Sequence, residues 1–389
     1  MTRQLAAAFG ALALAASPAI AQEPVKIGLI MAYSGQFADA SSQMDNAVKL
    51  YVQKHGDTVA GRKIEFIRRD TGGVPDNAKR HAQELLVRDK VDILAGFVIT
   101  PEALSVADLS AEAKKLMVVM NAATSIITTR SPYIARTSVT VPQLNEPFGA
   151  WAYKNGVHKA FTMVSDYGPG IDAEGAFQRS FKDAGGQLLG SVRMPVANPD
   201  FFPFVQRAKD LNPEAIYVFI PGGAQPGAFG KALTDLGIDP RKTKVLGQGE
   251  ITDENALKVI GNSALGMITA FHYDYNHKSK ANAEFVAAYN AANNRNPDIY
   301  SIGGWDGMHL IYESLKKTGG KADGDSLIAA AKGMKWESPR GPIEIDAETR
   351  DIIQTVYIRR VEKVGDQLVN VEIDKVDHVK DPVKERMKK

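Results

Sequence analysis

The sequence contains no cysteine among its 389 residues. Disulfide bonds and a lipid-modified cysteine are therefore excluded, and the folded chain must be stabilised by packing alone. Long apolar runs are also scarce. The one at the N-terminus, residues 5–16, is too short to cross a bilayer, and no later segment reaches membrane length.

Residues 1–21 have the features of a signal peptide. A short basic start ends at Arg3, an apolar run of Ala, Leu and Phe follows, and Ala19-Ile20-Ala21 fits the small-x-small cleavage rule. A buried N-terminal helix is the alternative, but it does not account for the cleavage site. We therefore expect export to the periplasm, with Gln22 as the first mature residue.

The sequence has little excess charge and lacks common motifs of catalysis and nucleotide binding. A net charge of +2 from dispersed basic residues gives no reason to expect nucleic acid as a partner. Neither a Walker A sequence nor a G-x-G-x-x-G that joins a strand to a helix is present. Ser263 lies in a segment one residue too long for a G-x-S-x-G elbow. His272 and His277 have no third metal ligand nearby, so we expect no metal and no cofactor. No His lies at a predicted strand end beside a Ser, so we expect no enzyme activity.

The length and patterning of the chain indicate two lobes. A chain of 389 residues is too long for one ordinary core, and 44% hydrophobic with 24% charged residues is usual for a globular protein. Strands alternate with helices in two successive series, which predicts an α/β fold of two doubly wound, mostly parallel sheets. We assign residues 22–141 plus 272–350 to an N-terminal lobe. Residues 142–271 plus 351–389 form a C-terminal lobe and a charged, loosely held tail, and several crossings make a hinge.

Small polar turns follow consecutive strands of the first predicted sheet. Val91–Ala95 leads to Thr100, a good helix N-cap, and Leu116–Met120 leads to a turn that contains Thr124. Tyr33 ends the first strand at the same edge. Ligands bind at this edge of open α/β sheets, and a helix N-terminus there suits an anion. Thr100 and Thr124 therefore predict a seat for a small carboxylate, although from spacing alone they could equally serve only as helix caps.

Several short motifs, weak singly, occur in a specific order and spacing. They include Ser34-Gly35 after the first strand, Asp70, Asn121-Ala-Ala-Thr, Asp166-Tyr-Gly, and the segment from Tyr300 to Asp306. With them, almost the whole mature chain resembles a type I periplasmic substrate-binding protein of the Leu/Ile/Val-binding group. The resemblance implies a monomeric, two-lobed receptor that closes around a small carboxylate ligand and delivers it to an ABC permease.

The resemblance also implies which residues meet the ligand. In that family the carboxylate is held at the positions that match Thr100, Ala122 and Thr124. A tyrosine from the other lobe matches Tyr167, and an aromatic residue near the ligand matches Tyr300. The full expected binding set is Tyr33, Val98, Thr100, Ala122, Ala123, Thr124, Tyr167, Ala224, Gln225, Gly249, Glu250 and Tyr300.

The departures from the family concern the rest of the ligand. Val141 stands where one acid would hold the ammonium group of an amino acid, and the other acid falls at Gly249 or Glu250. Ala40 and Ala224-Gln225 replace large aromatic residues. A buried ammonium without an acidic partner costs several kcal/mol, which favours a carboxylic acid without that group, such as an aromatic one. If Glu250 reaches the cleft, a branched-chain amino acid is again favoured. A sensor for a signalling partner and an exported hydrolase are the alternatives to a transport receptor.

Overall fold

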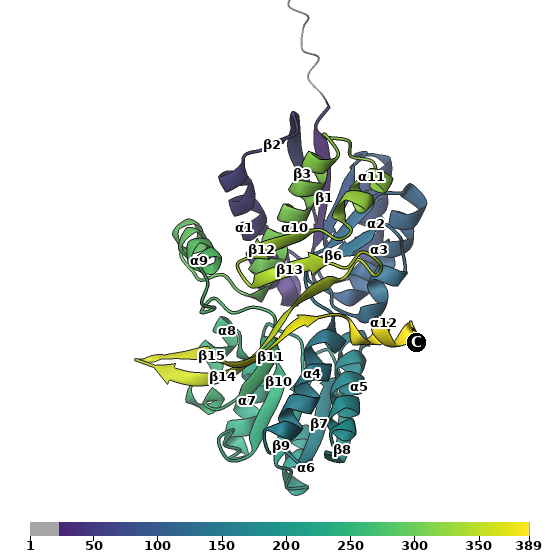
Figure 1. The fold of residues 1–389 in the computed structure, drawn as a ribbon. Coiled ribbons are helices and arrows are strands. Elements are labelled where there is room, and N and C mark those ends of the chain that lie inside the picture. Colours follow the sequence, from purple (N-terminus) through teal and green to yellow (C-terminus); the bar gives the residue numbers. More distant parts are fainter. Residues whose placement is uncertain (1–22, 389) are drawn as a thin grey trace, which may run out of the picture.

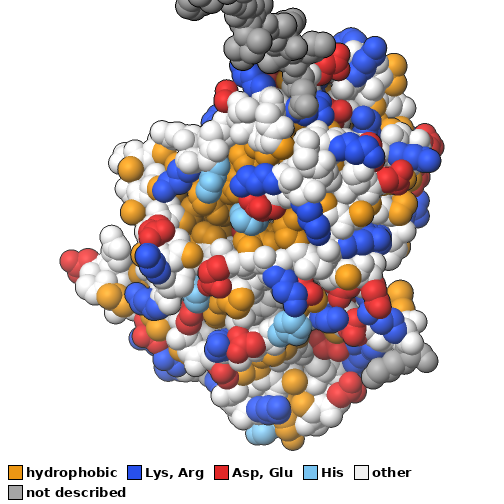
Figure 2. Space-filling model, turned by 45° about the horizontal axis from the view of Figure 1, so that its top comes forward, with side chains coloured by type: hydrophobic (Ala, Val, Ile, Leu, Met, Phe, Trp, Pro, Cys, Tyr) orange, Lys and Arg blue, Asp and Glu red, His pale blue; other side chains and the backbone are white. Residues whose placement is uncertain are grey.

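The structure, a computed structural model, describes residues 23–388. It consists of two α/β lobes, one above the other in Figure 1, with the C-terminal strands crossing between them. The predicted signal peptide lies outside the described residues. Within them, no helix combines the length and the apolar character needed to span a bilayer. On the face drawn in Figure 2, acidic and basic side chains are interspersed.

The first lobe contains a six-stranded sheet in the order β2-β3-β1-β4-β5-β6. All neighbouring strands are parallel except β2 and β3. Its strands are β1 (Val25–Met31), β2 (Thr58–Val59), β3 (Arg62–Asp70), β4 (Ile93–Gly96), β5 (Leu116–Val119) and β6 (Ile134–Arg136). The central strands are buried on both faces, which is why they read as short, continuous apolar runs.

Helices cover both faces of this sheet (Figure 1). They are α1 (Ala38–His55), α2 (Pro75–Val87), α3 (Thr100–Ala113), α10 (Ile299–Lys317) and α11 (Gly324–Ala331), with the 3-10 helices η1 (Gly35–Phe37) and η2 (Ser125–Thr129) and the outlying α9 (Lys280–Asn293). α10 packs closely on α1: a Cβ at Gly304 would lie 2.4 Å from the carbonyl oxygen of Met44. This close approach brings the start of α10 to the strand ends of the sheet.

A nine-stranded sheet in the order β12-β13-β14-β11-β10-β9-β7-β8, with β15 paired to β14, is centred on the second lobe. Its strands are β7 (Lys159–Ser165), β8 (Gln187–Met194), β9 (Ala215–Phe219), β10 (Lys244–Gln248), β11 (Ile268–Phe271), β12 (Lys335–Ser338), β13 (Gly341–Ile345), β14 (Ile352–Val364) and β15 (Gln367–Val379). Its strands β12 and β13 lie beside α10 of the first lobe (Figure 1). Strands β7 to β11 are parallel, and β14 runs antiparallel to β11.

Helices also flank the second sheet. They are α4 (Val141–Lys154), α5 (Gly168–Asp183), α6 (Phe202–Asp210), α7 (Gln225–Asp235) and α8 (Glu254–Ile260), with η3 (Gly249–Thr252) and η4 (Gly261–Ala264). Hydrogen bonds between β13 and β14 join residues on either side of the predicted lobe boundary at 350/351, so the sheet extends into the hinge. The predicted lobe boundaries stay a prediction.

The expectation of a loosely held tail is wrong. β15 continues to Val379, and α12 (Pro382–Met387) follows it. Lys384 is buried, where its Nζ contacts both Asp351 and Thr128, and Arg386 pairs with Glu146. The charged residues of this segment suggested a loose tail, but in the structure they pair with residues that are far away in the sequence. The strands β6 and β12 were not predicted from the sequence.

Candidate ligand-binding site

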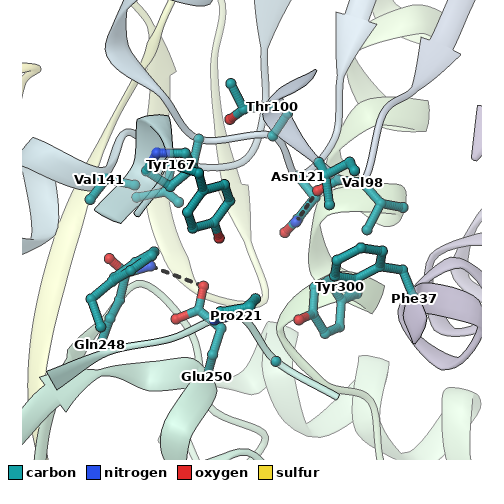
Figure 3. Close-up of a pocket in the computed structure, with 17 residues that line it drawn as sticks. Phe37, Val98, Thr100, Asn121, Val141, Tyr167, Pro221, Gln248, Glu250 and Tyr300 are labelled. Carbon is teal, nitrogen blue, oxygen red and sulfur yellow. Dashed lines mark hydrogen bonds between the residues drawn. The ribbon is translucent and has the colours of Figure 1, made fainter. Parts of the chain in front are cut away.

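A pocket of about 530 Å³ lies between the two lobes. It is lined by Phe37, Val98, Ile99, Thr100, Asn121, Ala122, Ala123, Val139, Val141, Tyr167, Pro169, Phe219, Pro221, Gly222, Gln248, Glu250 and Tyr300. These residues come from the ends of β4 and β5, the starts of α3, α5 and α10, and the ends of β9 and β10 (Figure 3). The pocket therefore lies where the carboxyl ends of parallel strands from both sheets face each other.

The two lobes touch across this pocket. The Ser125 N–H donates to Asp172 Oδ2 at 2.9 Å, and Asn255 Nδ2 donates to Asp39 Oδ2 at 2.9 Å. A Cβ on Gly168, at the start of α5, would lie 3.1 Å from Thr124 Oγ1. These contacts join elements of the first lobe to elements of the second, so the structure is a closed form.

Thr100 and Thr124 lie together on the first-lobe side. Their Oγ1 atoms are 2.9 Å apart, and the Thr124 N–H donates to Thr100 Oγ1 at 3.3 Å. The prediction that Thr100 is an N-cap is wrong: Ile99 occupies that position, and Thr100 is the first residue of α3. Thr124 precedes η2 but makes no side-chain capping bond. The interpretation of both hydroxyls as helix caps alone therefore fails.

Two helix N-termini meet at these threonines. α3 begins at Thr100, and α5 begins at Gly168, the residue next to Thr124. The N–H groups of Thr100 and Ala123 donate to no described residue, whereas the Ala122 N–H donates to the carbonyl of Phe97 at 2.9 Å. The Ala122 N–H is thus bonded within the protein in this conformation, and the expected role of Ala122 in holding the carboxylate stays a prediction. Free donors and two positive helix ends still make this side of the pocket suitable for an anion.

Arg136 supports the loop that carries the threonines. This fully buried residue donates to the carbonyls of Ala122 at 3.1 Å and Thr124 at 2.9 Å, and its Nε lies 3.0 Å from Asp351 Oδ1. Because the guanidinium occupies the loop's carbonyls, the loop is held in one conformation with the Thr124 hydroxyl at Thr100. Sequence analysis missed Arg136, whose only signal was an arginine within an apolar stretch.

On the second-lobe side a chain of hydrogen bonds ends at Glu250. Tyr217 donates to Asn145 Oδ1 at 2.6 Å, Asn145 donates to Gln248 Oε1 at 2.9 Å, and Gln248 donates to Glu250 Oε1 at 2.9 Å. Burial raises the pKa of Glu250 to about 7. Of the two residues left open in the sequence, Glu250 lines the pocket. Gly249 packs instead against Phe271: a Cβ added to Gly249 would lie 2.3 Å from the nearest atom of the Phe271 ring.

Four aromatic rings form part of the remaining wall. Phe37, Tyr167, Phe219 and Tyr300 line the pocket, and the rings of Tyr167 and Phe219 lie 6.2 Å apart between centroids. Burial raises the pKa of both phenols, so Tyr167 and Tyr300 stay neutral, and neither hydroxyl is bonded to another described residue. Val141, where an acid would hold an amino group, is buried and apolar.

The expected binding residues divide into two groups by position. Those that line the pocket are Val98, Thr100, Ala122, Ala123, Tyr167, Glu250 and Tyr300. Thr124 lies behind Thr100, and Tyr33, Ala224, Gln225 and Gly249 are not among the lining residues. Gln225 starts α7 and donates to the carbonyl of Val196 at 2.7 Å. The binding role of each residue in both groups stays a prediction.

Several lining residues were not predicted. They are Phe37, Ile99, Asn121, Val139, Pro169, Phe219, Pro221, Gly222 and Gln248. Ile99, Asn121 and Gln248 directly adjoin predicted residues, so these loops were predicted but not all of the residues in them that line the pocket. Phe37 belongs to η1, a short helix that the sequence did not suggest. The described residues contain no group of three or more His, Asp or Glu side chains able to hold a metal.

Comparison with known proteins identifies the family and the fold. The sequence model of the family described as periplasmic binding protein matches residues 24–366. The chain belongs to this family. A curated relative of this binding protein, Leu/Ile/Val-binding protein homolog 6 of Brucella abortus (strain 2308), is 41% identical over 96% of this chain and 97% of its own. The resemblance to the Leu/Ile/Val-binding group and the two-lobed α/β fold are thus confirmed.

Solved structures of ABC-transporter solute-binding proteins share the whole architecture. One from Rhodopseudomonas palustris BisB5, in complex with 3,4-dihydroxybenzoic acid, is 54% identical to this binding protein, with a TM-score of 0.90 over 93% of this chain and 99% of that one. Another from Rhodopseudomonas palustris HaA2, in complex with p-hydroxybenzoic acid, is 42% identical, with the same TM-score and the same coverage. These relatives are described as binding proteins and not as enzymes.

Proposed function

We propose that this protein captures a small aromatic carboxylate by closing its cleft and passes it to an ABC permease, without catalysing a reaction. The observation that carries the proposal is the combination in one pocket of an anion seat at two helix N-termini and a wall of aromatic rings. The rings suit a flat apolar ligand, because aromatic groups pack favourably at an offset or edge to face.

The lining residues disfavour an α-amino acid. Glu250 is the one acid that lines the pocket, and its pKa of about 7 shows that its surroundings resist a negative charge. The position at which a second acid would hold the ammonium group is occupied by the buried, apolar Val141. An ammonium group would need an ionised partner. This pocket provides at most one, Glu250, and ionising that buried carboxyl costs considerable free energy. The ligands of the two Rhodopseudomonas palustris relatives, both hydroxybenzoic acids, agree with an aromatic carboxylate.

A branched-chain amino acid is the second candidate, because Glu250 does reach the pocket. Isothermal titration calorimetry of the mature protein separates the two. We expect benzoate-type acids to bind with micromolar or lower dissociation constants and leucine to give no heat. Leucine binding without binding of any aromatic acid would overturn the proposal.

The proposal includes export to the periplasm and action as a monomer. The support is the N-terminal sequence, which fits a cleaved signal, together with membership of the periplasmic binding protein family. N-terminal sequencing of the periplasmic protein is expected to begin at Gln22. Uptake of labelled ligand by vesicles that contain the cognate permease, dependent on added binding protein, distinguishes transport from sensing.

A further inference from the structure

One oxygen of the pocket's acid has no partner. Oε1 of Glu250 accepts the hydrogen bond from Gln248, whereas Oε2 is buried and bonded to no described residue. Buried polar atoms in folded proteins are nearly always paired, so an unpaired one on a side chain that lines a binding pocket points to a group on the ligand.

The hydrogen bonds behind Glu250 fix its orientation. In the chain from Tyr217 through Asn145 and Gln248, each group donates towards the pocket, and Glu250 Oε1 accepts the last bond. Oε1 is thereby held in place by protein atoms, and Oε2 is left as the site for a ligand atom. This arrangement is built from four side chains on four elements, and three of these side chains are buried.

Glu250 lies across the pocket from the anion seat. In Figure 3, Thr100 is on one side and the carboxyl of Glu250 on the other, with the ring of Tyr167 between them. A flat, rigid acid with its carboxylate at Thr100 therefore points its far end at Glu250. An α-amino acid is less suitable, because its ammonium lies close to its carboxylate and not at the opposite end.

We propose, on the basis of the proposed function, that Glu250 Oε2 is the specificity determinant for a ring hydroxyl opposite the carboxylate, so that the ligands are hydroxylated aromatic acids. A hydroxyl both donates and accepts, and it therefore pairs with this carboxyl in either protonation state. A pKa near 7 makes both states accessible around neutral pH. A ring hydrogen or a methyl group offers neither bond and leaves Oε2 unpaired.

Calorimetry with benzoate and 4-hydroxybenzoate tests this assignment. We expect the unmodified protein to bind 4-hydroxybenzoate about tenfold or more tightly than benzoate. Glu250→Met, of similar length but without a polar oxygen, should remove that preference by weakening the binding of 4-hydroxybenzoate more than that of benzoate. Glu250→Gln retains a donor and an acceptor and should keep most of the preference. Glu284→Gln, the same change at an exposed site on α9, is the matched control.

The outcomes separate this assignment from the proposed function. Equal affinity of the unmodified protein for the two acids would overturn the role of Glu250 and leave an aromatic carboxylate receptor standing. An undiminished preference in Glu250→Met would do the same. If neither acid binds, both the assignment and the proposed function fall. Thermal unfolding of each variant verifies that it is folded. If Glu250→Met does not fold, the comparison of the two acids on the unmodified protein still decides the assignment.

Discussion

At the scale of single residues, the anion seat depends on a hydroxyl pair that serves no helix cap. Thr100 Oγ1 is buried and bonded to Thr124, so both groups are already ordered before a ligand arrives. Pre-ordered donors bind more tightly because no side-chain entropy is lost on association. The neighbouring N–H of Ala123 is also free, so the seat offers donors from both side chain and backbone.

Thr100→Val tests this seat with almost no change in side-chain volume. It removes a hydroxyl next to a charged ligand group, and we expect the binding free energy of 4-hydroxybenzoate to weaken by about 1–3 kcal/mol. Calorimetry measures the effect, and Thr58→Val on the exposed start of β2 is the control. An unchanged dissociation constant in Thr100→Val would place the carboxylate elsewhere in the pocket.

At the scale of elements, the sequence predicted those strands whose burial leaves a local mark. Apolar runs such as that of β1 are recognisable because parallel strands are covered on both faces. β6 and α12 were missed because each contains a charge that is buried against a distant partner. Arg136 pairs with Asp351, and Lys384 contacts the same carboxylate. Such pairing depends on the tertiary fold and has no local pattern.

The loops of the pocket were likewise predictable only where the sequence carries a local pattern. The turns after β4 and β5 were predicted because small polar residues follow apolar strands there, and Thr100 does line the cleft. The choice between Gly249 and Glu250 could not be made from the sequence, since a shift of one residue in a turn reverses which side chain faces inward. Phe219 and Pro221 end a strand on the other lobe, and only the closed arrangement brings them to the same pocket.

α12 gives a prediction at this scale, because it bridges the two lobes. Lys384 contacts Thr128 in η2 of the first lobe, and Arg386 pairs with Glu146 in α4 of the second. Ending the chain after Val379 should lower the free energy of unfolding by about 1–3 kcal/mol, since buried charged hydrogen bonds are lost while Asp351 keeps Arg136. It should also weaken ligand binding, because contacts present in the closed form are removed.

Urea denaturation and calorimetry measure the two effects of the truncation. Lys388→Ala is the control, because Lys388 is more exposed and makes ion pairs with Glu348 and Glu385. It is expected to leave both quantities unchanged, as surface ion pairs contribute little. A truncated protein with unaltered stability would show that α12 only lies against the hinge.

At the scale of the whole molecule, cleft closure also brings acids together. Asp253 caps α8 in the second lobe, and Asp298 caps α10 in the first. Both line one cavity at the lobe interface, and burial raises their pKa values to about 6 and about 7. Asp39 adds repulsion to both, and Arg295 offsets part of it. The closed form therefore holds protons that separated lobes would release to water.

This difference predicts that ligand affinity depends on pH. A carboxyl whose pKa is raised on closure favours the closed form while it is protonated, and this contribution is lost as pH rises through the raised pKa. For Asp298, whose pKa in this closed form is about 7 against an ordinary value of 3.8, the contribution is lost as the pH rises through the raised value and then levels off. We expect 4-hydroxybenzoate to bind about tenfold more tightly near pH 5 than near pH 8.

Asp298→Asn, which keeps a capping oxygen, should reduce this pH dependence, whereas the exposed Asp366→Asn should not. Calorimetry across this range in buffers of different ionisation enthalpy measures both the affinity and the protons taken up. Proton release on binding near pH 6 would contradict the argument, because it would mean that closure lowers the pKa values of these acids.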